Sequence, residues 1–250
     1  MHVFGRRQSP LSRWKGLSLP KMLGASTQRL ATVLCTSGLA VEAKIARAAG
    51  FSVVVGAGDR QRTQALVETA ATGTDCLVSF GIAGGLAPGL EAGTVIVSGD
   101  VVSEQQQWTV DPQYRDRLTE FARNVGAVEG SVFGASSVIA TQSEKRRAWA
   151  ATGALAVDLE SEIVARAAAA LGIPFLVLRS VADTAQRDLP PASLIPLSAD
   201  GTPNRSRVFA SVLRRPFQLA GMIGLAQETG MALSALVGPA RALRTFVGAA

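Results

Sequence analysis

The sequence has few of the residues that build metal centres, histidine-dependent catalytic triads and disulfide frameworks. The only histidine is His2, near the start of the chain, which excludes a triad with a histidine base and a multi-histidine metal site. The two cysteines, Cys35 and Cys76, each lie in an apolar run that is typical of a strand. Because a disulfide scaffold needs several spaced cysteines in loop-rich sequence, we expect two buried thiols in a reducing cytoplasm.

Aromatic residues make up only 5% of the chain. The helical region that follows residue 204 contains no apolar run of the roughly 20 residues that a membrane-spanning helix needs. With 48% hydrophobic and 18% charged residues over 250 positions, the chain is long and apolar enough to bury a sizeable core. We therefore predict a single domain over residues 30–250.

Acidic residues are absent from the start of the chain: Glu42 is the first of 19, whereas six of the 25 basic residues precede position 30. The remainder is therefore balanced, with 19 residues of each sign, and lacks the basic footprint of a nucleic-acid-binding protein. Residues 1–29 contain no apolar segment of the kind found in secretory signals. We expect a basic, disordered leader there; a transit peptide, a surface-binding arm and a later start at Met22 are the alternatives.

What the sequence does contain is a regular alternation of strand and helix patterns. The predicted strands cover residues 31–36, 51–55, 76–80, 94–102, 131–139, 156–157 and 174–180, and the predicted helices cover 39–50, 60–72, 114–124 and 160–171. Such alternation is typical of an α/β domain in which helices cover both faces of a mostly parallel central sheet. A proline-rich stretch then leads into a helical C-terminal region from about residue 204.

A strand followed by Gly56-Ala-Gly58 imitates the start of a dinucleotide-binding fingerprint. The third glycine of that fingerprint would fall at Gln61, so the close helix-to-strand approach that it needs is missing. We interpret this segment as an ordinary tight turn and expect no nicotinamide cofactor.

Four glycines follow the strand predicted at 76–80, in the segment Gly81-Ile-Ala-Gly-Gly-Leu-Ala-Pro-Gly89. Bare backbone of this kind lets a ligand approach closely and leaves amide hydrogens free to bind it. Glycine-rich turns also arise for purely steric reasons. The segment alone is therefore only a candidate binding loop.

Three acidic residues stand where predicted strands end. Asp158 and Glu160 lie at a strand-to-helix junction, and Asp183 follows the strand predicted at 174–180. Because ligands of open α/β sheets bind beyond the carboxyl ends of the strands, these carboxylates would face one cleft. The alternatives are helix capping for the first two and a turn position for Asp183.

Three segments, in this order, resemble one enzyme superfamily. They are Phe80–Pro88 with the following Gly93–Ser98, then Val157–Ser161, then Pro174–Asp183. Together they resemble the glycine loop, ribose-binding segment and acid segment of the purine nucleoside phosphorylase and methylthioadenosine/S-adenosylhomocysteine nucleosidase superfamily. The resemblance spans roughly residues 31–185 and implies cleavage of the N-glycosidic bond of a purine nucleoside.

Within that superfamily the chain is most similar to the hopanoid-associated phosphorylase group, which is thought to remove adenine from adenosylhopane. The similarity lies in the segments 37–46, 56–59, 108–111 and 189–191 and in the helical tail. It implies a lipid-linked nucleoside substrate. A methylthioadenosine or purine nucleoside enzyme acting on a soluble substrate is the second hypothesis, and a non-catalytic nucleoside-binding protein is the third.

The resemblance assigns a role to each acid. Asp183 would protonate the departing base, which requires a raised pKa, and Glu160 would accept hydrogen bonds from the ribose hydroxyls, with Leu159 beside it. Retention of both acids argues against the non-catalytic reading. Ala182 stands where relatives often have a serine next to the acid, so one orienting hydrogen bond is missing.

The base itself would lie near Gly81, Ile82, Val138 and Ile139, by the same resemblance. The reaction needs no metal and no organic cofactor, although inorganic phosphate is a possible co-substrate. The family also suggests a homo-oligomer.

The attacking group is left open between water and phosphate. Glu42 falls near the family's water-activating glutamate, and the positions that hold phosphate in one branch correspond here to Ser79 and Ile82, which favours hydrolysis. Arg60, Lys44 or an arginine of a partner subunit could still bind phosphate.

A lipid-linked substrate would need an apolar surface beside its 5′ end. Two segments of the C-terminal region, Met222–Leu225 and Met231–Leu236, could form that surface or make a peripheral contact with the inner membrane face. The plain alternative is that they pack in the core or in an oligomer interface.

Overall fold

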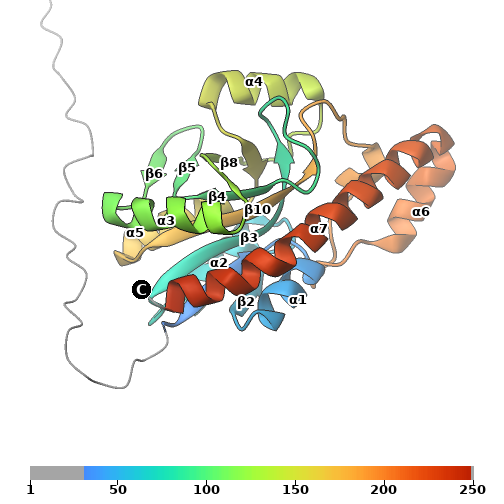
Figure 1. Cartoon of the computed structure of the whole chain (residues 1–250). Helices are drawn as coiled ribbons and strands as arrows, with labels where there is room; N and C mark the ends of the chain where they lie inside the picture. The colour runs from blue at the N-terminus through green and yellow to red at the C-terminus, as the bar shows by residue number, and fades with distance from the viewer. Residues whose placement is uncertain (1–30, 249–250) are drawn as a thin grey trace, which may run out of the picture.

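The computed structural model describes residues 31–248 as an α/β domain built on one mixed, mostly parallel sheet of ten strands (Figure 1). The strands are β1 (Val33–Ser37), β2 (Ser52–Val55), β3 (Cys76–Gly85), β4 (Val95–Ser98), β5 (Asp100–Val102), β6 (Gln107–Thr109), β7 (Val128–Glu129), β8 (Val132–Gly134), β9 (Ala156–Asp158) and β10 (Phe175–Asp183). The helices are α1 (Ala40–Ala48), α2 (Arg60–Ala70), α3 (Pro112–Asn124), α4 (Gln142–Thr152), α5 (Ser161–Leu171), α6 (Arg205–Arg214) and α7 (Leu219–Gly248), with short 3-10 turns η2 (Pro191–Leu194) and η3 (Pro216–Gln218).

The two longest strands, β3 and β10, form the centre of the sheet. The order is β6-β5-β8-β9-β3-β10-β4-β7, and β1 pairs with both β2 and β3. The pairs β10–β4, β3–β9 and β5–β6 are antiparallel, and the other pairs are parallel. Alternate residues of β10 point to opposite faces, and both faces are buried because helices cover them.

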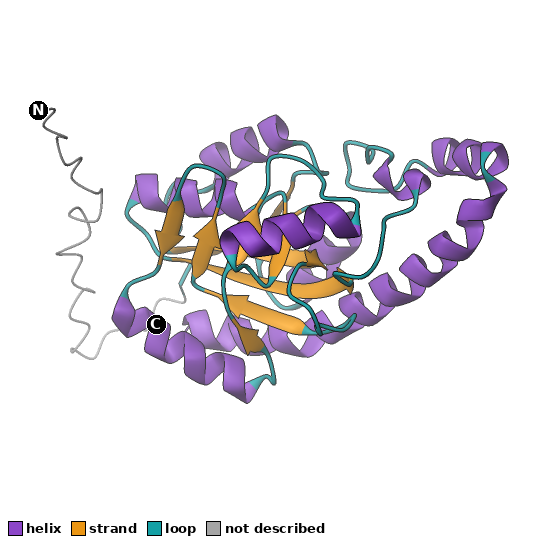
Figure 2. Ribbon diagram, turned by 90° about the horizontal axis from the view of Figure 1, so that it is seen from above, coloured by secondary structure: helices purple, strands orange, loops and turns teal. Residues whose placement is uncertain are grey.

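Helices lie on both faces of the sheet (Figure 2), and two hydrophobic clusters fill the space between the sheet and these helices. On one face, apolar residues of α1, α3 and α7 pack on the strands, with Leu118, Leu236 and Leu243 wholly buried. On the other face, α2 and α5 contribute Val67, Ile163 and small residues that let the helices approach closely. The predicted α/β architecture is confirmed.

Several segments differ from the sequence-based expectation, among them residues 131–139, where the predicted strand ends at Gly134. The first glycines of the predicted binding loop instead continue β3 to Gly85, because this stretch pairs with β10 on one side and β9 on the other. The strand predicted at 94–102 is broken at Gly99, where the side chains of Val110 and Leu118 fill the space that a side chain would need.

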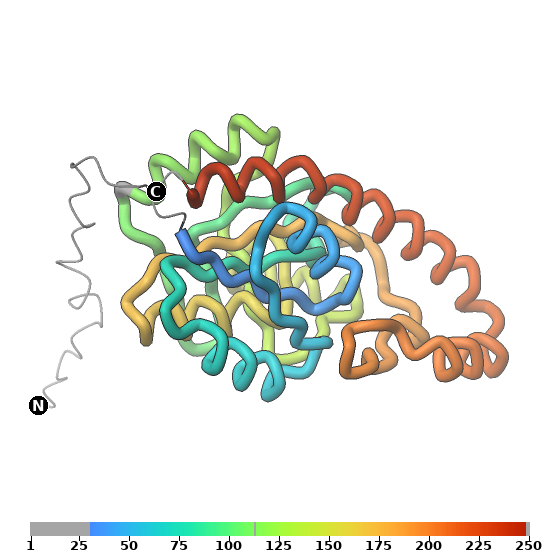
Figure 3. The backbone as a smooth tube through the Cα atoms, turned by 90° about the horizontal axis from the view of Figure 1, so that it is seen from below, coloured from blue at the N-terminus to red at the C-terminus, as the bar shows by residue number. Residues whose placement is uncertain are grey.

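The C-terminal region forms a helical arm. We use this term for residues 205–231, which comprise α6, η3 and the first turns of α7, and which extend beyond the edge of the sheet (Figures 1 and 3). Gln218 is buried and clamps the arm: its amide nitrogen donates to the Ser211 carbonyl at 2.9 Å, and its amide oxygen accepts from the Ala192 backbone at 2.9 Å. Further along, α7 returns across the sheet and reaches the start of the described chain, where Arg244 donates to the Ala31 carbonyl.

No helix between residues 31 and 248 combines the length and the apolar character needed to cross a membrane. The basic leader expected at residues 1–29 lies outside the described residues.

Candidate active site

The candidate site lies at a gap in the strand pairing along one edge of β3. Pairing with β1 ends at Ser79, and pairing with β9 begins only at Gly84. Between them, Ile82 forms its hydrogen bonds with side chains: its amide donates to Glu42 Oε1 at 2.8 Å, and its carbonyl accepts from Arg179 Nη1 at 3.2 Å. Two charged side chains thus take the place of a neighbouring strand.

Glu42 comes from the first turn of α1 and is almost completely buried. Its other carboxylate oxygen accepts from the backbone amides of Gly38 at 3.0 Å and Leu39 at 2.8 Å, which fixes the side chain at the start of the helix. A side chain at Gly81 would place its Cβ 2.5 Å from this carboxylate, so glycine is required there. Burial raises the pKa of Glu42, although Arg179 and these amides oppose the shift.

Asp158 and Glu160 have separate roles at the start of α5. Asp158 caps the helix, accepting from the backbone amides of Glu160 at 3.0 Å and Ser161 at 2.7 Å. The Glu160 side chain makes no capping bond; one oxygen accepts from Arg179 at 3.1 Å, and the other faces Gly38. Burial raises the pKa of Glu160 to about 7, against the opposing charge of Arg179. The capping alternative therefore holds for Asp158 and not for Glu160.

Arg179 connects these acids from the middle of β10. Its side chain is 1% exposed and forms ion pairs with Asp158 at 2.8 Å and Glu160 at 3.1 Å, and it donates to Ser79 Oγ at 2.6 Å. Arg179 lies within the segment Pro174–Asp183, and no separate role was predicted for it from the sequence. The signal was present, because a charged residue inside an apolar strand must be paired when it is buried.

Asp183 is the last residue of β10 rather than a turn residue, and it is 8% exposed. Its Oδ2 forms an ion pair with Lys145 of α4, a lysine that is wholly buried. A Cβ on Gly84 would lie 3.2 Å from the same oxygen, so the carboxylate sits directly against β3. Burial raises the pKa of Asp183, and Lys145 is the main opposing influence. No role for Lys145 was predicted from the sequence.

A small cleft of about 110 Å³ opens beside Asp183. Its walls include Leu159, Val138 and Ile139, so the structure brings these sequence-predicted residues together with Asp183. The predicted residues Gly81 and Ile82 lie further along β3, beside Glu42 rather than in the lining of this cleft. Asp158, which lines the cleft and pairs with Arg179, joins the two groups.

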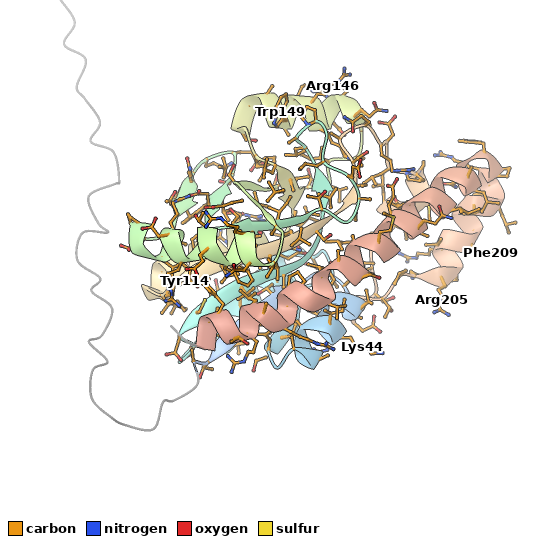
Figure 4. The ribbon with its side chains drawn as sticks, in the orientation of Figure 1. Lys44, Tyr114, Arg146, Trp149, Arg205 and Phe209 are labelled. Carbon is orange, nitrogen blue, oxygen red and sulfur yellow. The ribbon has the colours of Figure 1, made fainter. Side chains whose placement is uncertain are left out.

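The basic residues considered as phosphate ligands lie elsewhere. Arg60, at the start of α2, forms an ion pair with Glu162. Lys44 lies in a different hollow, of about 190 Å³, between α1 and α7 (Figure 4). Within residues 31–248, no three His, Cys, Asp or Glu side chains gather closely enough to hold a metal ion.

The comparisons with known proteins agree with this architecture. The model of the phosphorylase superfamily matches residues 33–214. No curated protein sequence matches the chain.

Among solved structures, the chain is similar to the 5′-methylthioadenosine/S-adenosylhomocysteine nucleosidase of Neisseria meningitidis in complex with methylthio-immucillin-A. The identity is 17% and the TM-score 0.60, over 88% of this chain and 100% of that chain. It is also similar to futalosine hydrolase of Helicobacter pylori, with 14% identity and a TM-score of 0.58 over 84% of this chain and 97% of that one. At these identities the likeness concerns the fold. Since the family match covers most of the described chain, the protein belongs to the phosphorylase superfamily and is an enzyme that cleaves N-glycosidic bonds.

Proposed function

We propose that the enzyme releases a purine base from a nucleoside, and that its substrate is a lipid-linked 5′-deoxyadenosyl compound of the adenosylhopane type. The observation that carries the reaction is the arrangement of acids along the bare backbone of β3. Glu42 lies against Gly81, and Asp183 lies against Gly84, three residues further on. At about 3.3 Å per residue, these two glycines are about 10 Å apart, and the ribose and base are proposed to bind between the two acids.

Asp183 is proposed as the group that protonates the base. Breaking the C1′–N9 bond leaves the electron pair on the base, so a proton donor beside the ring lowers the barrier. Asp183 lines the cleft, and its Oδ1 has no hydrogen-bond partner among the described residues. The apolar side chains of Val138, Ile139 and Leu159 line the cleft and would pack against a purine ring.

Glu160 is proposed to bind the ribose hydroxyls. Its carboxylate lies against Gly38, where a Cβ would come within 2.9 Å of one oxygen, and Arg179 donates to the other oxygen at 3.1 Å. The positive charge that develops on the ribose in the transition state would be stabilised by this carboxylate.

Water is proposed as the nucleophile, with Glu42 as its base. The buried carboxylate has a raised pKa, as a base working near neutral pH requires. Phosphate would have to bind close to Glu42 and Glu160, whereas Arg179 is already paired with two acids and Arg60 with Glu162. These pairings favour hydrolysis over phosphorolysis.

The arm supports a lipid-linked substrate. It exposes large apolar side chains, with Phe209 and Leu213 each 66% exposed and Phe217 79% exposed. The chain has four arginines and no acid between Asp200 and Glu228 (Figure 4 labels Arg205 and Phe209). A surface that is both apolar and basic suits an anionic membrane. Of the segments predicted from sequence, Met231 and Ile223 are exposed, whereas Leu236 belongs to the core.

The arm is also connected to the cleft. Leu189 lines the cleft, and the next residue, Pro190, lies against Gly221 at the start of α7. Arg187, four residues after the proposed acid, pairs with Glu228 of α7 at 2.5 Å. A substrate held in a bilayer by its lipid chain could therefore present its nucleoside to the cleft while the arm contacts the membrane.

Base release by the purified protein tests the reaction. The protein is incubated with adenosylhopane, 5′-methylthioadenosine or inosine, each with and without phosphate, and products are identified by mass spectrometry. We expect adenine from adenosylhopane and a free ribose derivative in both conditions. If only 5′-methylthioadenosine released adenine, the lipid substrate would be wrong; a ribose 1-phosphate product would replace water with phosphate as the nucleophile.

A further inference from the structure

The ion pair between Lys145 and Asp183 is the one strong contact of the candidate site that the proposed mechanism leaves unexplained. Lys145 lies in the first turn of α4, and its side chain is 0% exposed. A lysine is rarely buried completely unless its charge is paired, because removing an ammonium group from water is costly. A buried lysine in contact with a carboxylate that lines the cleft calls for a function.

All three protons of the ammonium group are engaged. One is donated to Asp183 Oδ2, one to the Thr184 carbonyl at 2.8 Å and one to the Arg187 carbonyl at 3.0 Å. An ammonium group has three donors, so Lys145 has none left for a substrate. It touches the acid and the backbone that follows the acid, and it therefore acts on the reaction through Asp183.

The contact also fixes which oxygen faces the substrate. Lys145 occupies Oδ2, and the neighbour at position 182 is alanine, which cannot orient the carboxylate. The helix that carries Lys145 follows directly on the cleft wall at Val138 and Ile139. The Lys145 side chain thereby links the acid to the helix that follows the cleft wall.

We propose that Lys145 is the positioning residue for the base-protonating acid, holding Asp183 by Oδ2 so that Oδ1 faces the purine and setting the proton affinity of the carboxyl group. This inference rests on the proposed function of Asp183. The other charged groups that act on Asp183 are Arg187, on the following loop, and Glu228, on α7. These two pair with each other at 2.5 Å, so their effects largely cancel and Lys145 dominates.

The test compares the pH dependence of kcat/KM for base release in the wild type, in Lys145→Met and in Arg146→Met. Arg146 is the next residue on α4 and lies on its outer side (Figure 4), so its loss is the matched control. Removing the cation beside Asp183 favours the protonated carboxyl group, so the limb on which activity falls with rising pH should move up by about one unit or more. The maximum should fall by at least about tenfold because the carboxyl group is no longer oriented. Arg146→Met should change neither.

Two further variants keep the test decisive. Lys145→Ala leaves a cavity in which added ethylammonium should restore the rate and return the high-pH limb of the activity profile to its wild-type position. Lys145→Arg keeps the charge, so this limb should stay in place even where the rate falls. Circular dichroism at each pH identifies any unfolded variant. A limb that stays fixed in folded Lys145→Met and Lys145→Ala would overturn the proposal. If the wild type released no base from any nucleoside, the proposed function itself would fail instead.

Discussion

At the scale of single residues, the site consists of buried charges that are paired incompletely. Arg179 is 1% exposed and has three acids around it, Asp158, Glu160 and Glu42, which raise its pKa against the effect of burial. One cation cannot neutralise three carboxylates. Burial is the main reason that the pKa of Glu160 is raised to about 7, and the charges of Asp158 and Glu42 add to the shift while Arg179 opposes it.

Asp183→Asn should remove the proton donor while keeping the shape of the side chain. We expect kcat for base release to fall by about 10²- to 10⁴-fold, the usual contribution of a positioned acid. Binding of 5′-methylthioadenosine, measured by calorimetry on the inactive variant, should change little. The control is Asp188→Asn, an exposed acid in the following loop that accepts from the Gln142 amide. Equal turnover by Asp183→Asn would remove the assignment.

Glu160→Gln should change how stability depends on pH. Because the pKa of Glu160 is raised from 4.5 to about 7 in the fold, the native state holds a proton that the unfolded chain loses between these values. The contribution of this group to stability is therefore complete below pH 4.5 and lost as pH rises through about 7. A glutamine cannot ionise, so the variant should be more stable than the wild type at pH 8, by up to about 3 kcal/mol.

Chemical unfolding at pH 4 and pH 8 measures this difference. The advantage of the variant should shrink at pH 4, where both proteins are uncharged at this position. A wild type that gained stability relative to the variant with rising pH would show that Glu160 is held ionised by Arg179. Activity should fall in Glu160→Gln at every pH, since the ribose contact is lost.

At the scale of elements, the decisive feature is the strand β3, which is paired on one edge by β1 and then by β9, with a gap between them. Gly81 lies at the start of that gap with φ of +148°, a conformation that other residues rarely adopt. The glycine segment therefore serves as strand backbone against which acidic side chains pack, and not as a flexible loop.

Gly81→Ala should disable the site through a steric clash with Glu42. We expect base release to fall by at least about 100-fold, because displacement of a catalytic group by about 1 Å is enough for such a loss. Gly73→Ala is the control: it has φ of +76° and nothing within 4 Å of its added Cβ, so it carries backbone strain alone. Its activity should stay normal while its melting temperature falls slightly. An active Gly81→Ala enzyme would contradict the proposed place of Glu42.

Much of this architecture could be predicted from the sequence, because buried strands of a parallel sheet appear as short apolar runs between helical patterns. The capping box of Thr141 and Glu144 at the start of α4 also follows from the spacing of these two residues in the sequence. The continuation of β3 through the glycines could not be predicted, since it depends on pairing with residues about 70 to 100 positions away. Lys145 was hidden for a similar reason: it precedes two arginines, and only the rotation of α4 against the sheet decides which of the three is buried.

At the scale of the whole molecule, the arm carries large exposed apolar side chains together with four arginines. The arm is held in a defined conformation by the buried side chain of Gln218, so its exposed phenylalanines belong to an ordered surface. Exposed apolar patches of this kind mark contact sites for membranes or proteins. The arginines of the arm favour an anionic bilayer as the partner.

Vesicle sedimentation tests this surface. We expect the protein to bind vesicles that contain phosphatidylglycerol, to bind neutral vesicles less, and to dissociate as salt shortens the range of the charge interaction. Phe209→Ser combined with Phe217→Ser should weaken binding by about tenfold or more, given the apolar area lost. Trp149→Ser, which alters an exposed aromatic residue on α4, is the control. Self-association that the double variant abolishes, without vesicle binding, would identify a protein interface instead.

The hydrogen bonds of Ile82 have a consequence for how such an enzyme can change. Its amide and carbonyl are satisfied by Glu42 and Arg179, so replacing either residue breaks the sheet edge as well as altering the chemistry. The side chains of Val138 and Ile139 make apolar contacts in the cleft wall, so they can be replaced by other apolar side chains without loss of a hydrogen bond. Substitutions in that wall should therefore change the substrate that is bound, while the residues that cleave the bond are retained because the fold needs them.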